Sequence, residues 1–369
     1  MRFRQVTLQG FRNLPLVSVG LEGTRTFLCG DNAQGKSNFL EAVGYVTALR
    51  SFRGAESRAL LGLGQPQTAL AFEVEHEQFG DSRITVTFSP QGREVTWEQG
   101  KVTRLADFIG KFPTVVFSSQ DNQFLRGSPA LRRRWLDLTL AAMDPAYLVA
   151  LQSYTRAVAE RNMLLKQGGR DAGALDAFEH ELALHAATLV EKRTAGVSEL
   201  DGLFRAAHGR LLPDSEATTS EGEKSGMVYA PDSVAATRAE FAQLLLKGRP
   251  RDTLLKSTER GPHRDDIELL LAGRPAKQFS SEGQQRCLVI ALRLAQAAYF
   301  KRKGGITPVL LCDDVLGELD PDRRLKFWAS LEGEHQVIAT GTSRPVEDGT
   351  RWQLLNVEHG KISAAGDPS

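Results

Sequence analysis

The sequence predicts an α/β fold in which a long, mainly α-helical segment interrupts a mixed β-sheet. Alternating apolar patterns typical of strands dominate residues 1–120, where a single helical pattern follows a glycine-rich turn. Helical periodicity dominates residues 121–250, and short, almost continuously apolar runs typical of buried parallel strands return in residues 251–369. We therefore expect one head, built from the first and last segments, with a helical arm inserted between them.

Length and composition are those of an ordinary globular chain. The 369 residues are 41% hydrophobic and 25% charged, with a net charge of +1. This balance excludes a polybasic chain that coats nucleic acid, so any contact with nucleic acid needs a local patch. The opening MRFRQVTLQGF has no apolar signal core, and no run approaches the ~20 apolar residues of a membrane span. We expect a cytoplasmic protein without a membrane partner.

In the first segment, alternation with a period of two predicts strands around one helix. The helix, at 36–49, carries apolar side chains at helical spacing, among them Phe39, Leu40, Val43 and Val46. The predicted strands are 6–14, 24–30, 68–76, 82–89, 93–102 and 111–119.

Long helices are predicted next, before strands return. A helix at 235–248 should end before Arg249 and Pro250, because proline inside a helix removes a backbone hydrogen bond. The other predicted helices are 131–143, 145–167, 174–212, 281–299 and 321–331. The predicted strands of the last segment are 265–273, 306–314, 335–342 and 351–362.

The turn GDNAQGKS matches the phosphate-binding pattern G-x-x-x-x-G-K-[ST] and stands between a predicted strand and a predicted helix. Its backbone N–H groups and the helix N-terminus should surround the phosphates of ATP. Lys36 should reach the β- and γ-phosphates and face solvent when no nucleotide is bound, whereas Ser37 should bind Mg²⁺. The residues expected to contact nucleotide are Gly30, Asp31, Asn32, Ala33, Gln34, Gly35, Lys36, Ser37 and Asn38.

The run VLLCDD places two carboxylates at the end of a buried strand, where ligands bind in a parallel sheet. Asp313 is expected to hold Mg²⁺, and Asp314 to act as the base for the hydrolytic water. An acidic pair alone is weak evidence, because a solvated strand end carries the same residues. Together with the phosphate-binding loop, the pair indicates an ATPase.

The long sequence separation between these two motifs is typical of ABC-type P-loop ATPases, in which a large insertion leaves one sheet and rejoins it. In that class a Ser-x-Gly-Gln signature opens a helix that faces the nucleotide held by the other subunit. Ser281, Gly283 and Gln284 in SSEGQQR match this signature, so we expect them to contact the partner's ATP. Asp320 in GELD stands where such enzymes have a D-loop aspartate. The alternative is a plain helix cap.

Four further stretches carry a more specific resemblance. They are GFRNL near the start, LRSFRG behind the phosphate-binding helix, DNQFLRGSPALRRRWLD at the start of the arm, and GPHRDD at 261–266. With them, the chain resembles the RecF family of bacterial recombination-mediator ATPases, which are related to SMC-type heads. The resemblance runs from the first predicted strand to the last. It implies an ABC-type head that uses ATP and Mg²⁺ and forms a homodimer when ATP binds.

Three places depart from the related patterns, one of them Gly317, where the family often has Ser or Ala. The family often has Pro-Glu where Ser119 and Gln120 stand, and Gln120 is a candidate Q-loop ligand near Mg²⁺. After the strand HQVIAT, the switch histidine of ABC transporters is missing, and Gly341 or Thr342 stands in its place. This departure suggests the slow hydrolysis of a switch.

The resemblance also implies binding of double-stranded or gapped DNA, partnership with RecR and RecO, and delivery of RecA. The sequence offers Arg50, Arg53 and Arg58 as candidate contacts, which should meet phosphates without reading bases. A second cluster, 132–134, is equally compatible with an ion-paired helix face that packs against GPHRDD.

Two other functions fit parts of the same pattern. One is the ATPase subunit of a membrane transporter, against which the missing switch histidine, the long helical insertion and GPHRDD argue. The other is a nucleotide-gated DNA-binding scaffold with negligible turnover, and a single-turnover ATPase assay would separate it from an enzyme that uses Asp314.

Overall fold

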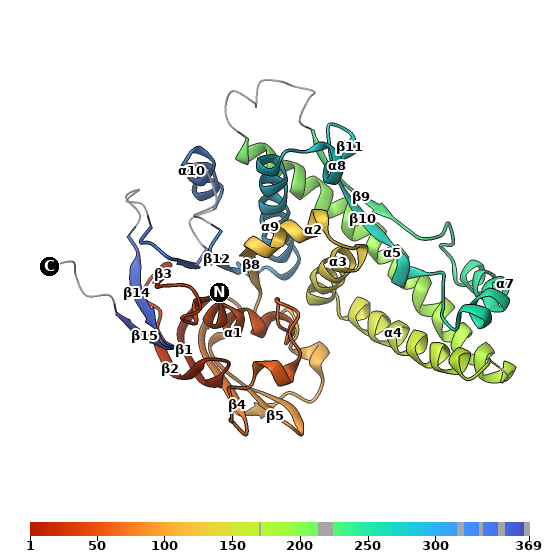
Figure 1. Cartoon of the computed structure of the whole chain (residues 1–369), viewed down its shortest axis with the longest axis horizontal. Coiled ribbons are helices and arrows are strands. Elements are labelled where there is room, and N and C mark those ends of the chain that lie inside the picture. Colours follow the sequence, from red (N-terminus) through yellow and green to blue (C-terminus); the bar gives the residue numbers. More distant parts are fainter. Residues whose placement is uncertain (170, 213–223, 316–320, 332–334, 346–350, 365–369) are drawn as a thin grey trace. The chain divides into compact units, whose positions relative to one another are not determined.

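The computed structural model shown in Figure 1 describes residues 1–169, 171–212, 224–315, 321–331, 335–345 and 351–364. These residues form two compact units. The P-loop unit comprises Met1–Asp121, Arg210–Asp214 and Arg293–Ser369, and the helical unit comprises Asn122–Gly209 and Ser215–Leu292. The division expected from the sequence, a head of 1–120 and 251–369 with an arm of 121–250, stays a prediction.

The first sheet of the P-loop unit is antiparallel. The segment predicted as one strand at 6–14 is strand up to Phe11, the end of β1, and Leu14 begins β2. A turn separates the two strands, in which Arg12 adopts a left-handed φ of 52°. The sheet has the order β2-β1-β4-β5-β6-β7. Its strands are β1 (Arg2–Phe11), β2 (Leu14–Gly20), β4 (Thr68–His76), β5 (Gly80–Ser89), β6 (Gly92–Trp97) and β7 (Gly100–Lys101).

The second sheet of this unit is parallel except for one edge strand, and it has the order β15-β14-β3-β13-β12-β8. All five residues of β12 are buried, as its apolar sequence predicts for a strand inside a parallel sheet. The strands are β3 (Arg25–Cys29), β8 (Thr114–Ser118), β12 (Val309–Asp313), β13 (Val337–Gly341), β14 (Gln353–Glu358) and β15 (Lys361–Ala364).

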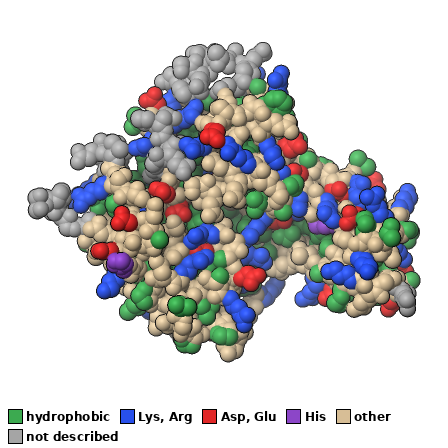
Figure 2. All heavy atoms as spheres, in the orientation of Figure 1, with side chains coloured by type: hydrophobic (Ala, Val, Ile, Leu, Met, Phe, Trp, Pro, Cys, Tyr) green, Lys and Arg blue, Asp and Glu red, His purple; other side chains and the backbone are tan. Residues whose placement is uncertain are grey.

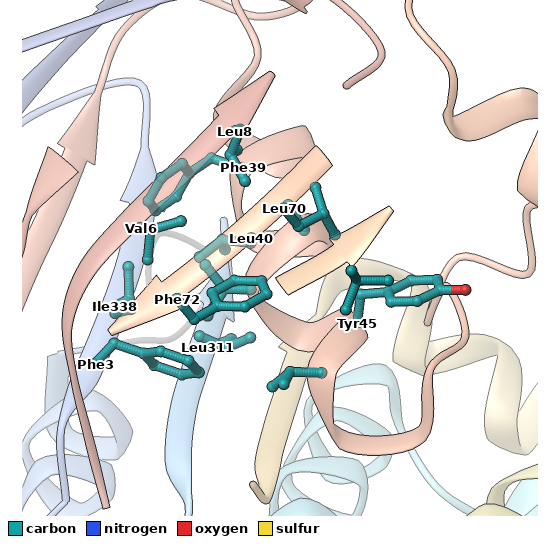
Figure 3. Packing of buried hydrophobic residues seen from close by; sticks show 14 of the residues in the cluster. Phe3, Val6, Leu8, Phe39, Leu40, Tyr45, Leu70, Phe72, Leu311 and Ile338 are labelled. Atoms are coloured by element: carbon teal, nitrogen blue, oxygen red, sulfur yellow. The ribbon is translucent and has the colours of Figure 1, made fainter. Parts of the chain in front are cut away.

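One helix, α1 (Lys36–Ala48), contributes to a hydrophobic core shared with both sheets. Figure 3 shows its Phe39 and Leu40 among Phe72 of the first sheet and Leu311 and Ile338 of the second, all in one buried cluster. This packing fixes the helix that begins at the phosphate-binding loop. The other helices of the unit are η1 (Ser57–Leu60), η2 (Leu105–Asp107), η3 (Ser119–Asn122) and α10 (Pro321–Ser330).

The helical unit surrounds a three-stranded sheet of order β11-β10-β9. Its strands are β9 (Ser225–Ala230), β10 (Asp266–Leu271) and β11 (Arg274–Pro275). Its helices are α2 (Gln123–Arg126), α3 (Pro129–Met143), α4 (Pro145–Lys166), α5 (Ala172–Leu211), α7 (Arg238–Leu255), η4 (Pro262–Arg264), α8 (Ala276–Phe279) and α9 (Glu282–Gly304). Residues of α9 from Arg293 onward belong to the P-loop unit, and those of α5 from Arg210 onward do so too. Among the described helices, none has both the length and the apolarity that a membrane crossing requires.

The predicted end of α7 was wrong, because the helix continues through Pro250 to Leu255. Ion pairs on both sides of the proline hold it in place. Arg249 binds Glu179, and Asp252 accepts a hydrogen bond from the buried Arg161 at 2.8 Å. These tertiary contacts offset the backbone hydrogen bond that proline removes.

Candidate nucleotide-binding site

The candidate site lies where the parallel strands of the P-loop unit end. Asp313, the last residue of β12, is paired in register with Ser118 of β8 and Thr340 of β13. Its Oδ1 accepts hydrogen bonds from the Ser37 hydroxyl at 2.7 Å and from the Thr340 hydroxyl at 3.2 Å. The structure thus brings the two predicted Mg²⁺ ligands, Ser37 and Asp313, together.

The phosphate-binding loop uses glycine where a side chain would not fit. A Cβ at Gly30 would meet the Val357 carbonyl oxygen at 2.2 Å, and Gly35 has a φ of 117° at the start of α1. Ala33 also adopts a left-handed φ, of 66°. The loop therefore follows a course that glycine makes accessible.

Lys36 is buried, contrary to the expectation that it faces solvent. Its ammonium donates hydrogen bonds to the carbonyl oxygens of Gly30 at 2.6 Å and of Asp31 at 2.8 Å. The sequence analysis missed this arrangement because the loop's own carbonyl groups, which no motif records, satisfy the charged group.

A residue of the GFRNL motif forms hydrogen bonds with the phosphate-binding loop and with α1. Asn13 donates to the Ala33 carbonyl at 3.3 Å and accepts a hydrogen bond from Asn38 at 2.7 Å. The turn between β14 and β15 supports the loop too, since the backbone N–H of His359 donates to Oε1 of Gln34 at 2.6 Å. These contacts fix Asn38, Gln34 and Ala33 as parts of a rigid loop. Asp31 and Asn32 are exposed on the same loop.

A buried carboxylate, Glu41, connects two of the motifs to the P-loop helix. Arg12 of GFRNL donates to its Oε1 at 2.8 Å, and Ser51 and Arg53 of LRSFRG contact it at 2.5 and 3.5 Å. Arg53 also donates to Asn38 at 2.8 Å. The sequence analysis did not single out Glu41, although an acidic residue within the apolar run FLEAVGYV was a usable signal.

Asp313 at the end of β12 and Asp314 directly after it have different surroundings. Burial raises the pKa of Asp313 above its ordinary value, while the hydrogen bonds from Ser37 and Thr340 and the charge of Arg53 act in the opposite direction. Asp314 is exposed, adopts a left-handed φ of 56°, and donates its backbone N–H to the Thr340 hydroxyl at 3.1 Å. A strained backbone of this kind is common at functional sites.

Gln120 lies two residues beyond Ser118, at the same edge of the sheet, and it is exposed in η3. The turn is fixed by Asp121, which accepts a hydrogen bond from the Ser118 N–H at 2.9 Å and pairs with Arg293 of α9 at 2.5 Å. On the opposite side of β12, Gly341 is buried at the end of β13 and Thr342 is exposed.

The candidate signature residues belong to the helical unit. The Ser281 hydroxyl accepts from the Gln284 N–H at 3.3 Å, and Oε1 of Gln284 accepts from the Ser281 N–H at 2.9 Å. This reciprocal pair caps α9, and Gly283 follows in its first turn. The cap and a role toward a partner's nucleotide are compatible, because Ser281 is exposed. Asp320 lies outside the described residues.

The candidate DNA-contacting arginines differ in the ion pairs and hydrogen bonds that they form. Arg50, Arg53 and Arg58 are all exposed, and Arg53 also pairs with Glu41 at 3.5 Å. In the helical unit, Arg132 forms two hydrogen bonds with Asp266, at 2.7 and 2.8 Å. Its neighbour Arg133 donates to the backbone carbonyl of Asp265. The interpretation of this cluster as packed against GPHRDD is therefore confirmed for these two arginines.

No family model matches the chain. It is 35% identical over 375 residues to the DNA replication and repair protein RecF of Thermosynechococcus vestitus, covering 100% of this chain and 98% of that protein. The chain belongs to the RecF family. The RecF protein of Geotalea daltonii is 32% identical over 98% of this chain and 100% of its own length. The resemblance drawn from GFRNL, LRSFRG and GPHRDD is thereby confirmed.

Solved structures agree with membership of the RecF family. A RecF structure described as the recombination mediator with ATP in the RecFOR pathway matches with a TM-score of 0.89 and 26% identity, covering 99% of this chain and 97% of that one. An Smc head bound to the C-winged helix domain of ScpA matches with a TM-score of 0.55 and 16% identity, covering 99% and 98%, which concerns the fold alone. The predicted ABC-type ATPase head with a mixed sheet is confirmed.

Proposed function

We propose that this chain is an ATP-dependent DNA-binding clamp that acts as a recombination mediator at gaps in DNA. The hydrogen bond between Ser37 and Asp313 carries the proposal, because it unites the phosphate-binding loop and the acidic strand end of an ATPase. The relatives named for DNA replication and repair, and the relative solved with ATP in the RecFOR pathway, support it.

The residues of the site fit ATP with Mg²⁺. The Ser37 hydroxyl and the Asp313 carboxylate are hard oxygen ligands close enough to serve one cation. When bound, Mg²⁺ would neutralise charge on the β- and γ-phosphates. Lys36 would exchange the carbonyls of Gly30 and Asp31 for phosphate oxygens. Asp314, exposed beside Asp313, would orient the hydrolytic water and accept its proton.

ATP binding would join two heads so that Ser281, Gly283 and Gln284 of each chain meet the γ-phosphate held by its partner. The exposed hydroxyl of Ser281 and the N-terminus of α9 suit an anion. The closed homodimer would retain duplex or gapped DNA, with Arg50, Arg53 and Arg58 as phosphate contacts. Slow hydrolysis would then open it. In this role the chain would work in the cytoplasm with RecR and RecO and assist the loading of RecA.

Sedimentation of the full chain tests the proposed clamp. The chain is measured alone, with ATP, and with both ATP and gapped duplex DNA. A dimer that forms only with ATP, and cosediments with the DNA only in that state, is the expected result. A monomer under all three conditions contradicts the proposal. Single-turnover ATP hydrolysis in the same samples separates a slow ATPase from a scaffold that binds nucleotide without turnover.

A further inference from the structure

The exposed face of α7 in the helical unit combines leucines with cations. Its opposite face is buried, with Phe241 and Leu245 packed inside the unit. The exposed face carries Leu246, Pro250 and Leu254 at successive helical turns, and the two leucines are 58% and 80% exposed. Figure 2 shows hydrophobic and basic side chains close together on the lobe to which α7 belongs. Contiguous exposed apolar side chains of this kind mark interaction sites.

Three cations, Lys247, Arg251 and Lys256, flank the leucines and are exposed. Among the described residues, none of the three forms an ion pair with a carboxylate, whereas Arg249 on the other side of the helix pairs with Glu179. No acidic side chain is exposed anywhere from 241 to 256. The exposed face of this stretch is therefore positively charged, and the exposed carboxylate of the helix's first turn, Glu240, accepts the backbone N–H groups of Ala236 and Thr237.

A cavity of about 440 Å³ adjoins this face. Segment 231–235 and α7 line it, and Gln243 and Lys247 belong both to the lining and to the exposed side of the helix. Its apolar lining includes Leu244 and the fully exposed Val234. Its charged lining is made of Lys247, Arg260, Asp232 and Glu240, and Asp232 pairs with Arg260 at 2.9 Å. A volume of this size holds one or two large side chains and falls within the ~300–1,000 Å³ of ordinary binding cavities.

Pro250 is exposed on the same face and changes the helix's backbone hydrogen bonding. Proline has no N–H, so the carbonyl of Leu246 lacks the donor that a continuous α-helix would supply. The surface therefore offers exposed apolar side chains, cations that form no ion pair among the described residues, and a cavity within a few helical turns.

We propose that this α7 surface, made of Leu246, Lys247, Pro250, Arg251 and Leu254 with the adjoining cavity, docks an acidic amphipathic segment of a partner protein. Carboxylates of the partner would pair with the cations, and its apolar side chains would cover the leucines and enter the cavity. Nucleic acid suits the surface less well, because phosphates over Leu246 and Leu254 would leave apolar area uncovered. The inference goes beyond nucleotide and DNA binding.

Selection of random peptides displayed on phage against the full chain tests this proposal. The expected peptides combine Asp or Glu with large apolar residues. Two double variants locate the site: Leu246→Ser with Leu254→Ser removes the apolar part, and Lys247→Glu with Arg251→Glu reverses the charge. Each should lower the affinity of a selected peptide at least about tenfold, a loss of about 1.4 kcal/mol.

The matched control is Val149→Ser with Arg156→Glu on α4, which changes an exposed apolar residue and an exposed cation elsewhere in the helical unit. It should bind the peptides as the unmodified chain does. The proposal is overturned if the selected peptides lack acidic residues, or if their binding survives both α7 double variants. It is also overturned if the charge-reversed variant loses affinity for duplex DNA while the peptides bind unchanged.

Discussion

The hydroxyl of Ser37 donates a hydrogen bond to Oδ1 of Asp313 at 2.7 Å, across 276 positions of the sequence. This contact joins the first turn of α1 to the end of β12, where the proposed function places Mg²⁺ and the phosphates of ATP. Asp314, the next residue, is exposed beside this point and is the candidate base.

Asp314→Asn should preserve ATP binding and slow hydrolysis by roughly 10²–10⁴-fold, because an amide cannot accept the proton of the attacking water. The ATP-bound dimer should consequently persist for longer. Single-turnover hydrolysis and nucleotide affinity measure the two effects. Asp322→Asn on α10 is the control, since Asp322 is another exposed aspartate of the same unit. Hydrolysis at the parental rate would exclude Asp314 as the base.

Lys36→Met should weaken ATP binding by more than about tenfold, because each charge-assisted hydrogen bond to phosphate contributes roughly 1.5–3 kcal/mol. Since Lys36 is buried and bonded to Gly30 and Asp31, the change should also loosen the loop and lower the melting temperature. Isothermal titration and thermal unfolding measure both. Lys361→Met, at an exposed position of β15, should change neither. Unaltered ATP affinity would contradict the P-loop assignment.

Motifs with fixed spacing predicted the centre of the site well. GDNAQGKS and VLLCDD each combine a strand with the residue types that phosphate and Mg²⁺ require, so the two patterns alone were enough to expect that Ser37 and Asp313 meet. The sequence also predicted that β12 is a buried strand, because a continuous apolar run is typical of a strand packed on both faces.

Tertiary contacts explain what the sequence did not predict. The helix α7 passes through Pro250 because buried ion pairs of Arg249 and Asp252 hold both of its sides. Lys36 turns inward because backbone carbonyls accept its charge. Glu41 gains its role only when Arg12 and two residues of LRSFRG approach it in space. Local patterns carry no record of such distant partners.

Charge reversal at Arg50 and Arg58 should weaken DNA binding equally for all sequences. The salt dependence should become flatter, by a slope of about one for each phosphate that the protein no longer neutralises. Filter binding of duplex DNA over a series of salt concentrations measures this. An unchanged slope would place the DNA-binding surface away from these residues.

Arg132→Ala provides the contrast, because Arg132 is buried and paired with Asp266. Its loss should destabilise the helical unit by about 3 kcal/mol, because the largely buried carboxylate of Asp266 would lose its charged partner. The salt slope of DNA binding should stay as it is. Urea unfolding and the same filter-binding series separate the structural effect from a DNA-binding one.

His263 should make the helical unit less stable in acid. Burial lowers its pKa, and its ring nitrogens bond with Tyr154 and with the Thr258 carbonyl, each at 2.8 Å. A histidine with a lowered folded-state pKa contributes its stability fully above the unfolded value of about 6.5, and this contribution is lost as the pH falls below that value.

Melting temperatures between about pH 5 and pH 8 check this expectation for the chain and for His263→Gln, across the range in which histidine titrates. Burial also lowers the pKa of His76. The difference between the two curves therefore separates the contribution of His263 to stability from that of His76. The variant should lose less stability than the unmodified chain on acidification. Parallel curves would show that His263 does not contribute.

Ser281→Arg should block ATP-dependent dimerisation while leaving ATP binding intact, because the P-loop, Ser37 and Asp313 are unchanged in the variant. A bulky cation would occupy the exposed position from which Ser281 is proposed to meet the partner's γ-phosphate. Sedimentation with ATP measures the dimer. Ser280→Arg is unsuitable as a control because it disturbs the same cap, so Lys277→Arg in α8, at an exposed position of the same unit, serves instead.

Mixing variants decides whether the signature acts in trans. If each site combines Lys36 of one chain with Ser281 of the other, a heterodimer of Lys36→Met and Ser281→Arg keeps one intact site, and hydrolysis should return upon mixing. In a heterodimer of the double variant with unmodified chain both sites are damaged, so such a mixture should hydrolyse no more ATP than its unmodified homodimers supply. A signature acting in cis reverses both results. If Ser281→Arg alone dimerises normally with ATP, SSEGQQR has no role at the dimer interface. The segment then serves only as the helix cap formed by the hydrogen bonds between Ser281 and Gln284.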